Sequence, residues 1–424
     1  MEMSLSLSTI QYLVFDEADR LFEMGFSNHL TTILEKLPTS RQTLLFSATL
    51  PKSLVEFAKA GLQEPKLVRL DSEMKISSDL RMAFWSVKEG EKDAALLCLL
   101  KDVISVPLAD TGRSKGPSEG ESFTGTKTKK AKGNSGAGAT ILKPHQTLVF
   151  VSTQHHVAYV SSLLRLAGYS VSSIHGTLTQ DARTSSLSQF VNNHTSILVT
   201  TDVAARGIDI PVLENVVNYD FPVGNRVFVH RVGRTARMGR KGWAWSFVGR
   251  DELPYLLDLH LFLGRPLINE LSPSTSDPGG APGEDAFVDS LILGPFPRDA
   301  IDQELEYIKN IHETNYDLVN LKGVMERGTK MYNRTKGKAS PISYSRSKDM
   351  LSDAQWGFTY EGKVHPVWTL RVASDRVLGQ SRSNIQPQPS SSSTQVTRES
   401  LLQSLSRFRP SETVFEIGSR GKTA

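Results

Sequence analysis

The stretch that decides the fold is Tyr12-Leu13-Val14-Phe15-Asp16-Glu17-Ala18-Asp19. Four apolar, β-prone residues are followed at once by acidic side chains. Parallel strands that are buried on both faces have such continuous apolar runs, and open α/β sheets bind ligands at the carboxyl ends of their strands. The stretch therefore predicts a buried parallel strand that delivers acidic groups to the ligand-binding edge of a sheet.

Similar short β-rich runs recur along the chain, with helical patterns between them. They occupy residues 43–46, 66–70, 147–151, 171–174, 197–200, 215–219 and 243–248. Because strands that alternate with helices indicate doubly wound parallel sheets, the expected fold class is α/β.

Breaks in this alternation divide the chain. We expect an incomplete first domain at residues 1–71, a linker at 72–81 and a second domain at 82–265. Residues 109–139 contain seven glycines, a single aromatic residue and a basic cluster. Such a segment cannot bury enough apolar surface to become ordered, so it is predicted to be a disordered insertion.

The alternation of strands and helices stops after residue 265. Residues 266–424 are predicted to form a basic C-terminal extension that is mixed or partly disordered. Within it, Ile301, Leu305, Ile308 and His312 recur at helical spacing. Residues 322–348 hold eight Lys or Arg residues against one acid, Glu326.

The composition excludes several classes of protein. The 49 Lys and Arg residues against 45 Asp and Glu residues give a net charge of +4, which excludes a uniformly polybasic nucleic-acid-binding protein. The single cysteine, Cys98, excludes a disulfide framework and a multi-thiolate metal site, and it is predicted to pack in the core. No apolar run approaches the roughly 20 residues of a membrane-spanning helix, and the N-terminal residues lack the pattern of a signal peptide.

Asp16 and Glu17 are the strongest candidates for a chemical role. An apolar strand that ends in two acids suits a magnesium ion held on one carboxylate and a water polarised by the other, as in the Walker B arrangement of phosphoryl-transfer sites. The alternative is an acidic helix N-terminus that is stabilised by the helix dipole.

Ser47-Ala48-Thr49 follows a second strand in the same way. Its two hydroxyls could link the acidic site to a neighbouring element by hydrogen bonds. The alternative for so short a motif is an ordinary turn or helix cap.

His230, Arg234 and Arg237 lie at spacings of four and three residues. This spacing predicts that they project from one helical face, where two guanidinium groups suit the stabilisation of a transferring phosphoryl group. The alternative is a solvated basic face.

Residues 200–211 open at the end of a predicted strand with two threonines and continue into an Arg-Gly turn. Hydroxyls and backbone N–H groups in such a segment can bind phosphate oxygens. The alternative is a plain connection between a strand and a helix, with Asp202 as the helix cap.

Together these segments resemble the DEAD-box family of ATP-dependent RNA helicases, from residue 12 to about residue 264. Residues 16–19 match motif II, 47–49 motif III, 200–211 motif V and 230–240 motif VI, and residues 149–153 are similar to motif IV. His175, Gly176, Gln180, Arg183 and Phe190 fit the segment that follows motif IV. The resemblance implies two RecA-like doubly wound domains, of which the first is incomplete here.

The resemblance also implies roles for single residues, with ATP and Mg²⁺ as cofactors and RNA as partner. Asp16 would bind magnesium through water, Glu17 would activate the hydrolytic water and His230 would contact the acidic segment. Arg234 and Arg237 would be arginine fingers, and Asp209 would hold the ATP ribose. Asp19, Ser47 and Thr49 would couple the two domains. The residues that would contact the RNA backbone are Thr153, Arg183, Thr201 and Gly207.

The chain departs from the family pattern in one respect. It contains no glutamine motif and no G-x-x-x-x-G-K-[ST] phosphate-binding loop, because the Gly421-Lys422-Thr423 sequence has Glu416 where the motif requires glycine. We therefore expect an N-terminally truncated helicase that binds ATP poorly by itself and exposes an apolar face of its first sheet.

Two functional hypotheses stay open. The first is an ATP-dependent RNA helicase, and features such as residues 20–26 and 255–264 resemble a nucleolar subfamily that acts on pre-ribosomal RNA in large ribosomal subunit biogenesis. That resemblance implies nuclear and nucleolar localisation, with pre-ribosomal proteins as further partners and no membrane partner. The second is a non-catalytic RNA-binding or scaffold protein. In either case residues 322–348 predict a salt-sensitive contact with RNA.

Overall fold

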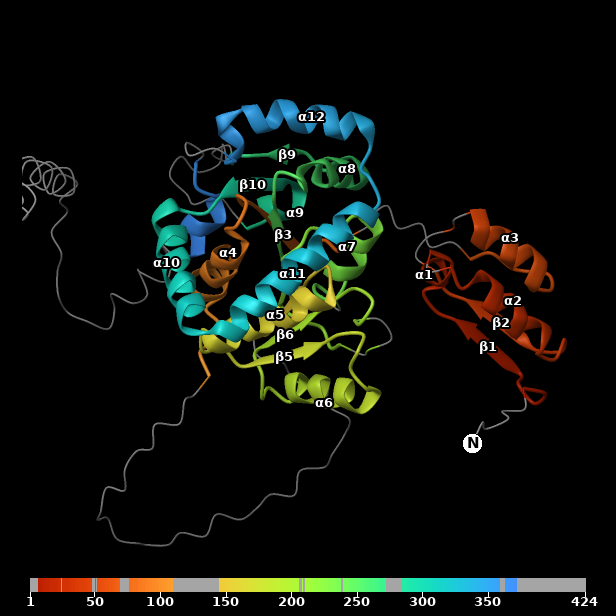
Figure 1. Cartoon of the computed structure of the whole chain (residues 1–424). Helices are drawn as coiled ribbons and strands as arrows, with labels where there is room; N and C mark the ends of the chain where they lie inside the picture. The colour runs from red at the N-terminus through yellow and green to blue at the C-terminus, as the bar shows by residue number, and fades with distance from the viewer. Residues whose placement is uncertain are drawn as a thin grey trace, which may run out of the picture. The chain divides into compact units, whose positions relative to one another are not determined.

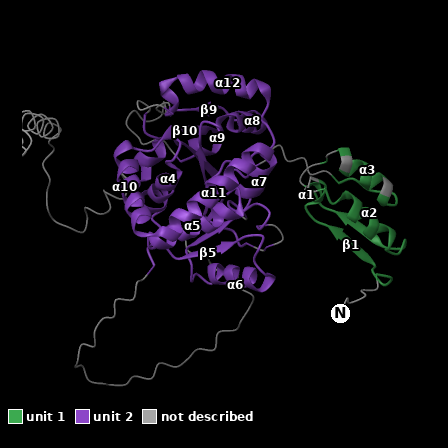
Figure 2. Cartoon of the chain, viewed as in Figure 1, with its two compact units in different colours: residues 1–73 green, residues 74–424 purple. Residues whose placement is uncertain are grey.

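The computed structural model describes residues 7–23, 25–47, 50, 52–68, 76–109, 145–205, 208, 210–237, 239–271, 284–358 and 363–371. The chain divides into two compact units, residues 1–73 and residues 74–424 (Figure 2). No described helix combines the length and the apolar character needed to cross a membrane.

Unit 1 is built on two parallel strands, β1 (Tyr12–Phe15) and β2 (Gln42–Leu45). Its helices are α1 (Ala18–Glu23), α2 (Ser27–Glu35) and α3 (Lys52–Gly61). The core between strands and helices is small and centres on Phe15, Ala18, Leu30, Leu54 and Phe57. The predicted strands at residues 12–15 and 43–46 are therefore confirmed, the second one residue earlier than expected.

One face of this small sheet is open. Tyr12 is 66% exposed and Val14 is 53% exposed on β1, and Phe46 beyond β2 is 56% exposed. The expectation of an exposed apolar face is confirmed. The strand predicted at residues 66–70 is wrong for residues 66–68, which form no strand, because Leu67 and Val68 pair with no neighbour and lie in solvent.

Unit 2 contains an eight-stranded parallel sheet with the order β5-β6-β4-β7-β8-β3-β10-β9 (Figure 1). The strands are β3 (Leu80–Ser86), β4 (Thr147–Phe150), β5 (Val171–Ile174), β6 (Ile197–Thr200), β7 (Asn215–Asn218), β8 (Gly242–Val248), β9 (Leu267–Ile268) and β10 (Leu291–Pro295). The central strands are buried along their whole length, as their apolar sequences predict.

Helices cover both faces of this sheet, which confirms the doubly wound α/β class. One hydrophobic core contains side chains of α4 (Lys92–Cys98), of its π-helical continuation η1 (Leu99–Val103), and of α5 (Gln154–Leu166), α9 (Ala286–Asp289), α10 (Arg298–Thr314) and α11 (Tyr316–Thr335). Two further cores contain side chains of α6 (Gln180–Val191), α7 (Asn225–Val232) and α8 (Leu253–Leu263). The helices α12 (Pro341–Ser352) and η2 (Ala354–Trp356) complete the unit. Cys98 is fully buried, as predicted.

The sheet crosses both predicted boundaries of the second domain. Strand β3 begins at Leu80, inside the segment predicted to be a linker, and β9 and β10 lie beyond residue 265. Strand β10 pairs with β3, so residues of the predicted C-terminal extension complete the sheet of the preceding domain. Most of the predicted insertion at 109–139 and residues 372–424 of the extension lie outside the described residues.

Candidate functional site

The acidic segment lies where the sequence predicts it, directly after β1. Asp16 is exposed, Glu17 is half-buried, and the Glu17 N–H donates a hydrogen bond of 2.9 Å to Asp16 Oδ1. Glu17 has φ +49°, in the left-handed region that costs a non-glycine residue on the order of 1–3 kcal/mol. Such strain concentrates at functional sites, so it adds a second reason to place chemistry at this turn.

Ser47 joins this acidic segment to the neighbouring strand. The N–H of buried Asp19 donates to Ser47 Oγ at 3.2 Å, and the Ala18 N–H donates to the Phe46 carbonyl at 3.0 Å. The predicted hydrogen-bonded link between the two motifs is therefore present in unit 1. Thr49 lies outside the described residues.

In unit 2 the register of the sheet gathers the other candidate residues at one edge. Phe150, Thr200 and Asn218 are the last residues of β4, β6 and β7, and Phe150 is paired with both of the others. Because the strands are parallel, the residues that follow each of them emerge side by side at the carboxyl edge, where α/β sheets bind ligands.

The residues predicted to contact the RNA backbone form specific hydrogen bonds within unit 2. Thr153 caps α5, since its Oγ1 accepts the His156 N–H at 3.3 Å. Thr201 Oγ1 accepts the Ala204 N–H at 3.3 Å, and Arg183 on α6 donates to the Ala204 carbonyl at 2.9 Å. Arg183 and Thr201 therefore hold the same turn, whereas Gly207 and Asp209 lie outside the described residues.

Asp202 is paired with a residue that the sequence did not single out. Arg231 is buried and forms a bidentate ion pair with Asp202, at 2.6 Å from Nε to Oδ1 and 2.8 Å from Nη2 to Oδ2. Arg231 also donates to the Asp220 carbonyl at 2.7 Å. This side chain therefore joins the segment 200–211 to the segment 230–240, and Asp202 is not a free helix cap.

The helical face predicted for His230, Arg234 and Arg237 is wrong. Helix α7 ends at Val232, and its C-cap is Gly233. The chain then turns: the Leu213 N–H donates to the Arg234 carbonyl at 3.1 Å, and buried Ala236 has φ +54°. His230 is therefore on the last turn of α7, while the two arginines lie on the loop beyond it, with Arg237 exposed.

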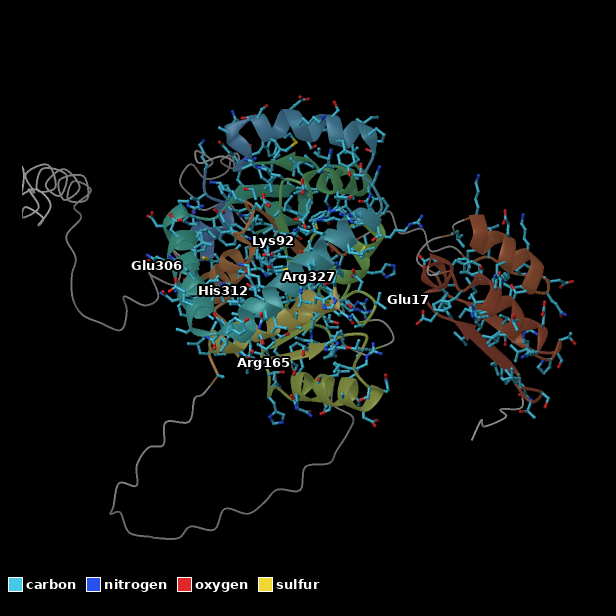
Figure 3. The ribbon with its side chains drawn as sticks, in the orientation of Figure 1. Glu17, Lys92, Arg165, Glu306, His312 and Arg327 are labelled. Carbon is cyan, nitrogen blue, oxygen red and sulfur yellow. The ribbon has the colours of Figure 1, made fainter. Side chains whose placement is uncertain are left out.

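Asp220 is the centre of a buried charge network that the sequence analysis missed. Its carboxylate accepts the Ser152 N–H at 2.8 Å and pairs with His156 at 3.7 Å and with Lys92, which is labelled in Figure 3, at 3.1 Å. Burial alone would raise the pKa of Asp220, but these partners together hold it well below its usual range. An acid at the end of a buried strand, as in Asn218-Tyr219-Asp220, is the signal that could have indicated it.

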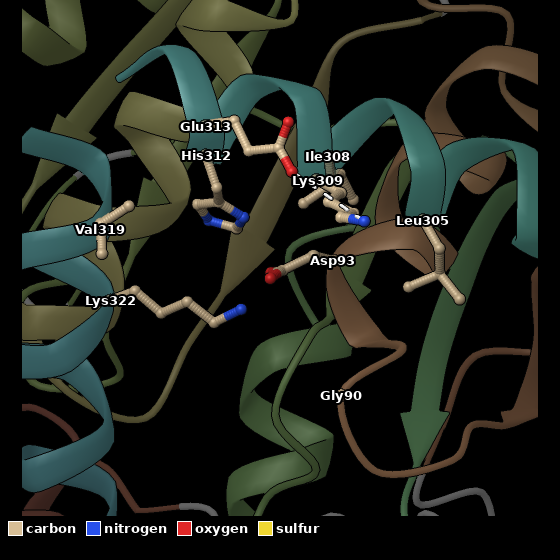
Figure 4. A pocket seen from close by; sticks show the side chains of 9 residues that line it. All are labelled: Gly90, Asp93, Leu305, Ile308, Lys309, His312, Glu313, Val319 and Lys322. Carbon is tan, nitrogen blue, oxygen red and sulfur yellow. Dashed lines mark ion pairs between the residues drawn. The ribbon is translucent and has the colours of Figure 1, made fainter. Parts of the chain in front are cut away.

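A separate pocket lies between α4, α10 and α11. It has a volume of about 400 Å³, and its lining includes Asp93, His312 and Lys322 (Figure 4). Both oxygens of Asp93 are already bonded, at 2.7 Å each, to the hydroxyls of Tyr159 and Tyr219. None of the predicted site residues lines this pocket.

The acidic turn of unit 1 fits a nucleotide-bound magnesium ion. Mg²⁺ is usually held by one or two carboxylates together with water and substrate phosphates, and Asp16 offers an exposed carboxylate at the sheet edge. Glu17 stands beside it and provides the second carboxylate that the chemistry needs.

Comparisons with known proteins agree with these positions. Residues 1–57 match the DEAD/DEAH box helicase model, and residues 137–239 match the helicase conserved C-terminal domain. The "ATP-dependent RNA helicase dbp10" of Schizosaccharomyces pombe is 48% identical over 99% of this chain and 46% of its own length. The relative named dbp-10 in Neurospora crassa is 45% identical over 100% of this chain and 41% of its own length.

The chain thus spans less than half of the length of these relatives. Among solved structures, "S. cerevisiae Dbp5 bound to RNA and ADP BeF3" is 25% identical over 61% of this chain and 59% of that chain, with a TM-score of 0.48. A hypothetical ATP-dependent RNA helicase from Sulfolobus tokodaii is 29% identical over 60% of this chain and 61% of that chain, with a TM-score of 0.33. The chain therefore carries segments similar to both helicase domain models, and over its whole length it resembles the dbp10 group of ATP-dependent RNA helicases.

Proposed function

We propose that the chain is part of an ATP-dependent RNA helicase, which couples ATP hydrolysis to the binding and remodelling of RNA. The observation that carries the proposal is the acidic turn after β1, where Asp16 and Glu17 stand together and Asp19 is bonded to Ser47. This arrangement places two carboxylates at a ligand-binding edge and ties them to the next strand of the same sheet.

In this proposal each acidic or basic group of the site has one task. ATP with its magnesium ion supplies the phosphoryl group whose transfer to water drives the reaction. Asp16 would hold the magnesium ion of ATP, and Glu17 would polarise the attacking water. Arg234 and Arg237 lie on the loop after α7 and stabilise negative charge, with His230 on the helix before them. Asp209 would contact the ribose.

The RNA side of the proposal rests on the carboxyl edge of unit 2. Thr153, Arg183, Thr201 and Gly207 would contact sugars and phosphates, so binding would have little sequence preference. The Arg183 bond to Ala204 and the Asp202 pair with Arg231 support a coupling between RNA and nucleotide, because they connect the segments expected to bind each.

The biological setting is proposed from the resemblance to the dbp10 group alone. We infer that the RNA is pre-ribosomal, that the work belongs to large ribosomal subunit biogenesis, and that the protein is found in the nucleus and nucleolus. Proteins of pre-ribosomal particles would then be its further partners.

RNA-stimulated ATP hydrolysis tests the catalytic proposal. Because the 424 residues contain no phosphate-binding loop, the assay compares this chain with a longer form extended upstream to include one. In the longer form, Glu17→Gln is expected to lower the rate on the order of 10²- to 10⁴-fold, since general-base contributions have this size.

The matched control is Glu35→Gln, which makes the same change of charge at an exposed position of α2. Its rate should equal that of the unsubstituted protein, and RNA binding should be kept in both variants. Equal rates for Glu17→Gln and Glu35→Gln would remove Glu17 from the reaction.

A second candidate function is RNA binding without catalysis by this chain alone. The observation in its favour is that Thr153, Arg183 and Thr201 lie in one compact unit together with the basic helix α11. Retention of RNA binding by both forms, with no ATP hydrolysis in either, would select this function.

A further inference from the structure

Helix α11 is fixed on unit 2 in a defined orientation. Leu318, Leu321 and Met325 pack on the hydrophobic core, and α11 lies along α5 (Figure 1). At Gly328, α11 approaches α5 so closely that an added Cβ would lie 3.0 Å from Cδ2 of His155. The next residue, Thr329, is hydrogen-bonded through Oγ1 to His156 Nε2 at 3.2 Å.

This orientation separates the basic residues of the segment 322–348 into two groups. Several are engaged with unit 2 itself: Lys336 lies over the Tyr255 ring at 5.3 Å, Arg346 is 3.2 Å from His260, and Lys322 lines the pocket beside His312. The overall excess of positive charge in this segment is therefore only partly available to a ligand.

The second group lies on the outer face of α11. Arg327, which is labelled in Figure 3, Lys330 and Arg334 are all exposed, and their spacing of three and four residues places them on one helical stripe. Among the described residues, none of these three side chains takes part in an ion pair. We call these three residues the α11 stripe.

The helix that carries the α11 stripe is anchored close in space to the predicted RNA edge. Thr329 and Gly328 contact His156 and His155, and α5 begins directly after Thr153. Thr153 Oγ1 is also 2.9 Å from His156 Nδ1, so one imidazole bridges the predicted RNA contact and the helix that carries the stripe. The helix that carries the stripe is therefore anchored beside the carboxyl edge of β4.

We propose that Arg327, Lys330 and Arg334 form a track that binds the phosphate backbone of RNA and extends the site at Thr153. This inference rests on the proposed function, because it assumes that Thr153 faces RNA. Three exposed cations on one face, with Glu326 as the one acid of the segment beside them, suit a phosphate chain. A protein partner would instead need a cluster of apolar anchors, and of the exposed apolar side chains of α11, Tyr316, Val319 and Met331, just Met331 lies between the first and last cations of the stripe.

The test is the affinity of the 424-residue chain for a single-stranded RNA, measured by fluorescence anisotropy between 50 and about 300 mM salt. The triple variant Arg327→Gln, Lys330→Gln and Arg334→Gln removes the stripe. Three phosphate contacts predict a loss of affinity on the order of 10- to 100-fold near 0.1 M salt. They also predict that the slope of log affinity against log salt concentration becomes shallower by about 2.

The matched control makes the same change of charge in unit 1, with Lys36→Gln, Lys59→Gln and Lys66→Gln at exposed positions. Its affinity and salt slope should stay close to those of the unsubstituted chain. Circular dichroism and thermal unfolding check that both variants fold, as substitutions of exposed side chains should allow.

The outcomes separate this inference from the proposed function. If the unsubstituted chain does not bind RNA, the proposed function fails. If it binds and the stripe variant keeps its affinity and slope, only the α11 stripe is overturned. A Glu-rich peptide is the competitor: if it binds the unsubstituted chain more tightly than RNA and loses that binding in the stripe variant, the stripe serves an acidic protein segment and the RNA track is rejected.

Discussion

His365 is a fully buried imidazole that holds residues 363–371 against the sheet. Its Nδ1 accepts the Val367 N–H at 3.1 Å, so Nε2 carries the proton and donates to the Ile292 carbonyl at 3.1 Å. The His365 ring centroid lies 4.4 Å from that of Trp85. Gly294 on β10 leaves room for the backbone of His365, because an added Cβ would lie 3.0 Å from the His365 Cα. Burial lowers the pKa of His365 from 6.5 to about 3, although the bond to Ile292 opposes the shift.

This lowered pKa predicts a contribution to the pH dependence of stability. Below about pH 6.5 the imidazole takes up a proton in the unfolded chain but stays neutral in the folded chain, down to about pH 3. Neutral His365 therefore contributes fully to the free energy of unfolding at neutral pH. As the pH falls through this window, that free energy decreases by about 1.4 kcal/mol for each pH unit.

Urea unfolding at several pH values measures this effect. His365→Gln should lower the free energy of unfolding at pH 7 and make its dependence on pH flatter than in the unsubstituted chain. The control is His194→Gln at an exposed position. If the stability of His365→Gln depended on pH as steeply as that of the unsubstituted chain, His365 would not be the source of this pH dependence.

At the scale of single residues, the sequence identifies side chains by their type and their distance along the chain. That was enough to find the acidic segment 16–19 and Ser47, because each begins directly after an apolar strand. It failed for Arg234 and Arg237, because a helical spacing has no meaning once Gly233 ends the helix. The Arg231 pair with Asp202 joins residues 29 positions apart, and only the packing of two loops at one sheet edge creates it.

At the scale of elements, apolar runs bounded by polar residues predicted most strands of the central sheet correctly. Strand β3 was missed because its first residues follow a charged, aperiodic segment, and β10 because Leu291–Pro295 ends in Gly and Pro, which are unfavourable in strands. Both are strands because each finds a parallel neighbour that satisfies its backbone, and β10 pairs with β3 itself.

Two glycines of α11 give a prediction about how this helix is held. At Gly323 the nearest atom to an added Cβ is Arg327 Nη1 at 3.8 Å, an ordinary contact, whereas at Gly328 it is His155 Cδ2 at 3.0 Å. Replacing glycine by alanine inside a helix gains up to about 1 kcal/mol where there is room. Gly323→Ala should therefore raise the free energy of unfolding, and Gly328→Ala should lose that gain because His155 must move.

Chemical denaturation of the two variants beside the unsubstituted chain measures this difference. The variants change the same residue type in the same helix, so each is the control for the other. If Gly328→Ala were stabilised as much as Gly323→Ala, α11 would not depend on close contact with α5 for its position.

At the scale of the whole molecule, the doubly wound class followed from the alternation of strands and helices, but the limits of the second sheet did not. A sequence shows where a pattern stops, and the pattern of short strands stops near residue 265. The sheet continues because Leu291, Ile292 and Leu293 are fully buried beside β3, with Phe287 and His365 packed against them. The extension is therefore part of the folding unit that carries the residues proposed to contact RNA, and α11 is positioned by that same unit.

The two units should differ greatly in local stability. The described part of unit 1 has two strands, a small core and an exposed apolar face, whereas the strands of unit 2 are covered by helices on both sides. Sheets of two strands are marginal without further packing, and regions with few buried contacts open most often. Hydrogen exchange followed by mass spectrometry should show the amides of Tyr12–Phe15 and Gln42–Leu45 exchanging on the order of 100-fold faster than those of Thr147–Phe150 and Ile197–Thr200. Equal protection of the four strands would mean that unit 1 gains stability from contacts beyond its own core.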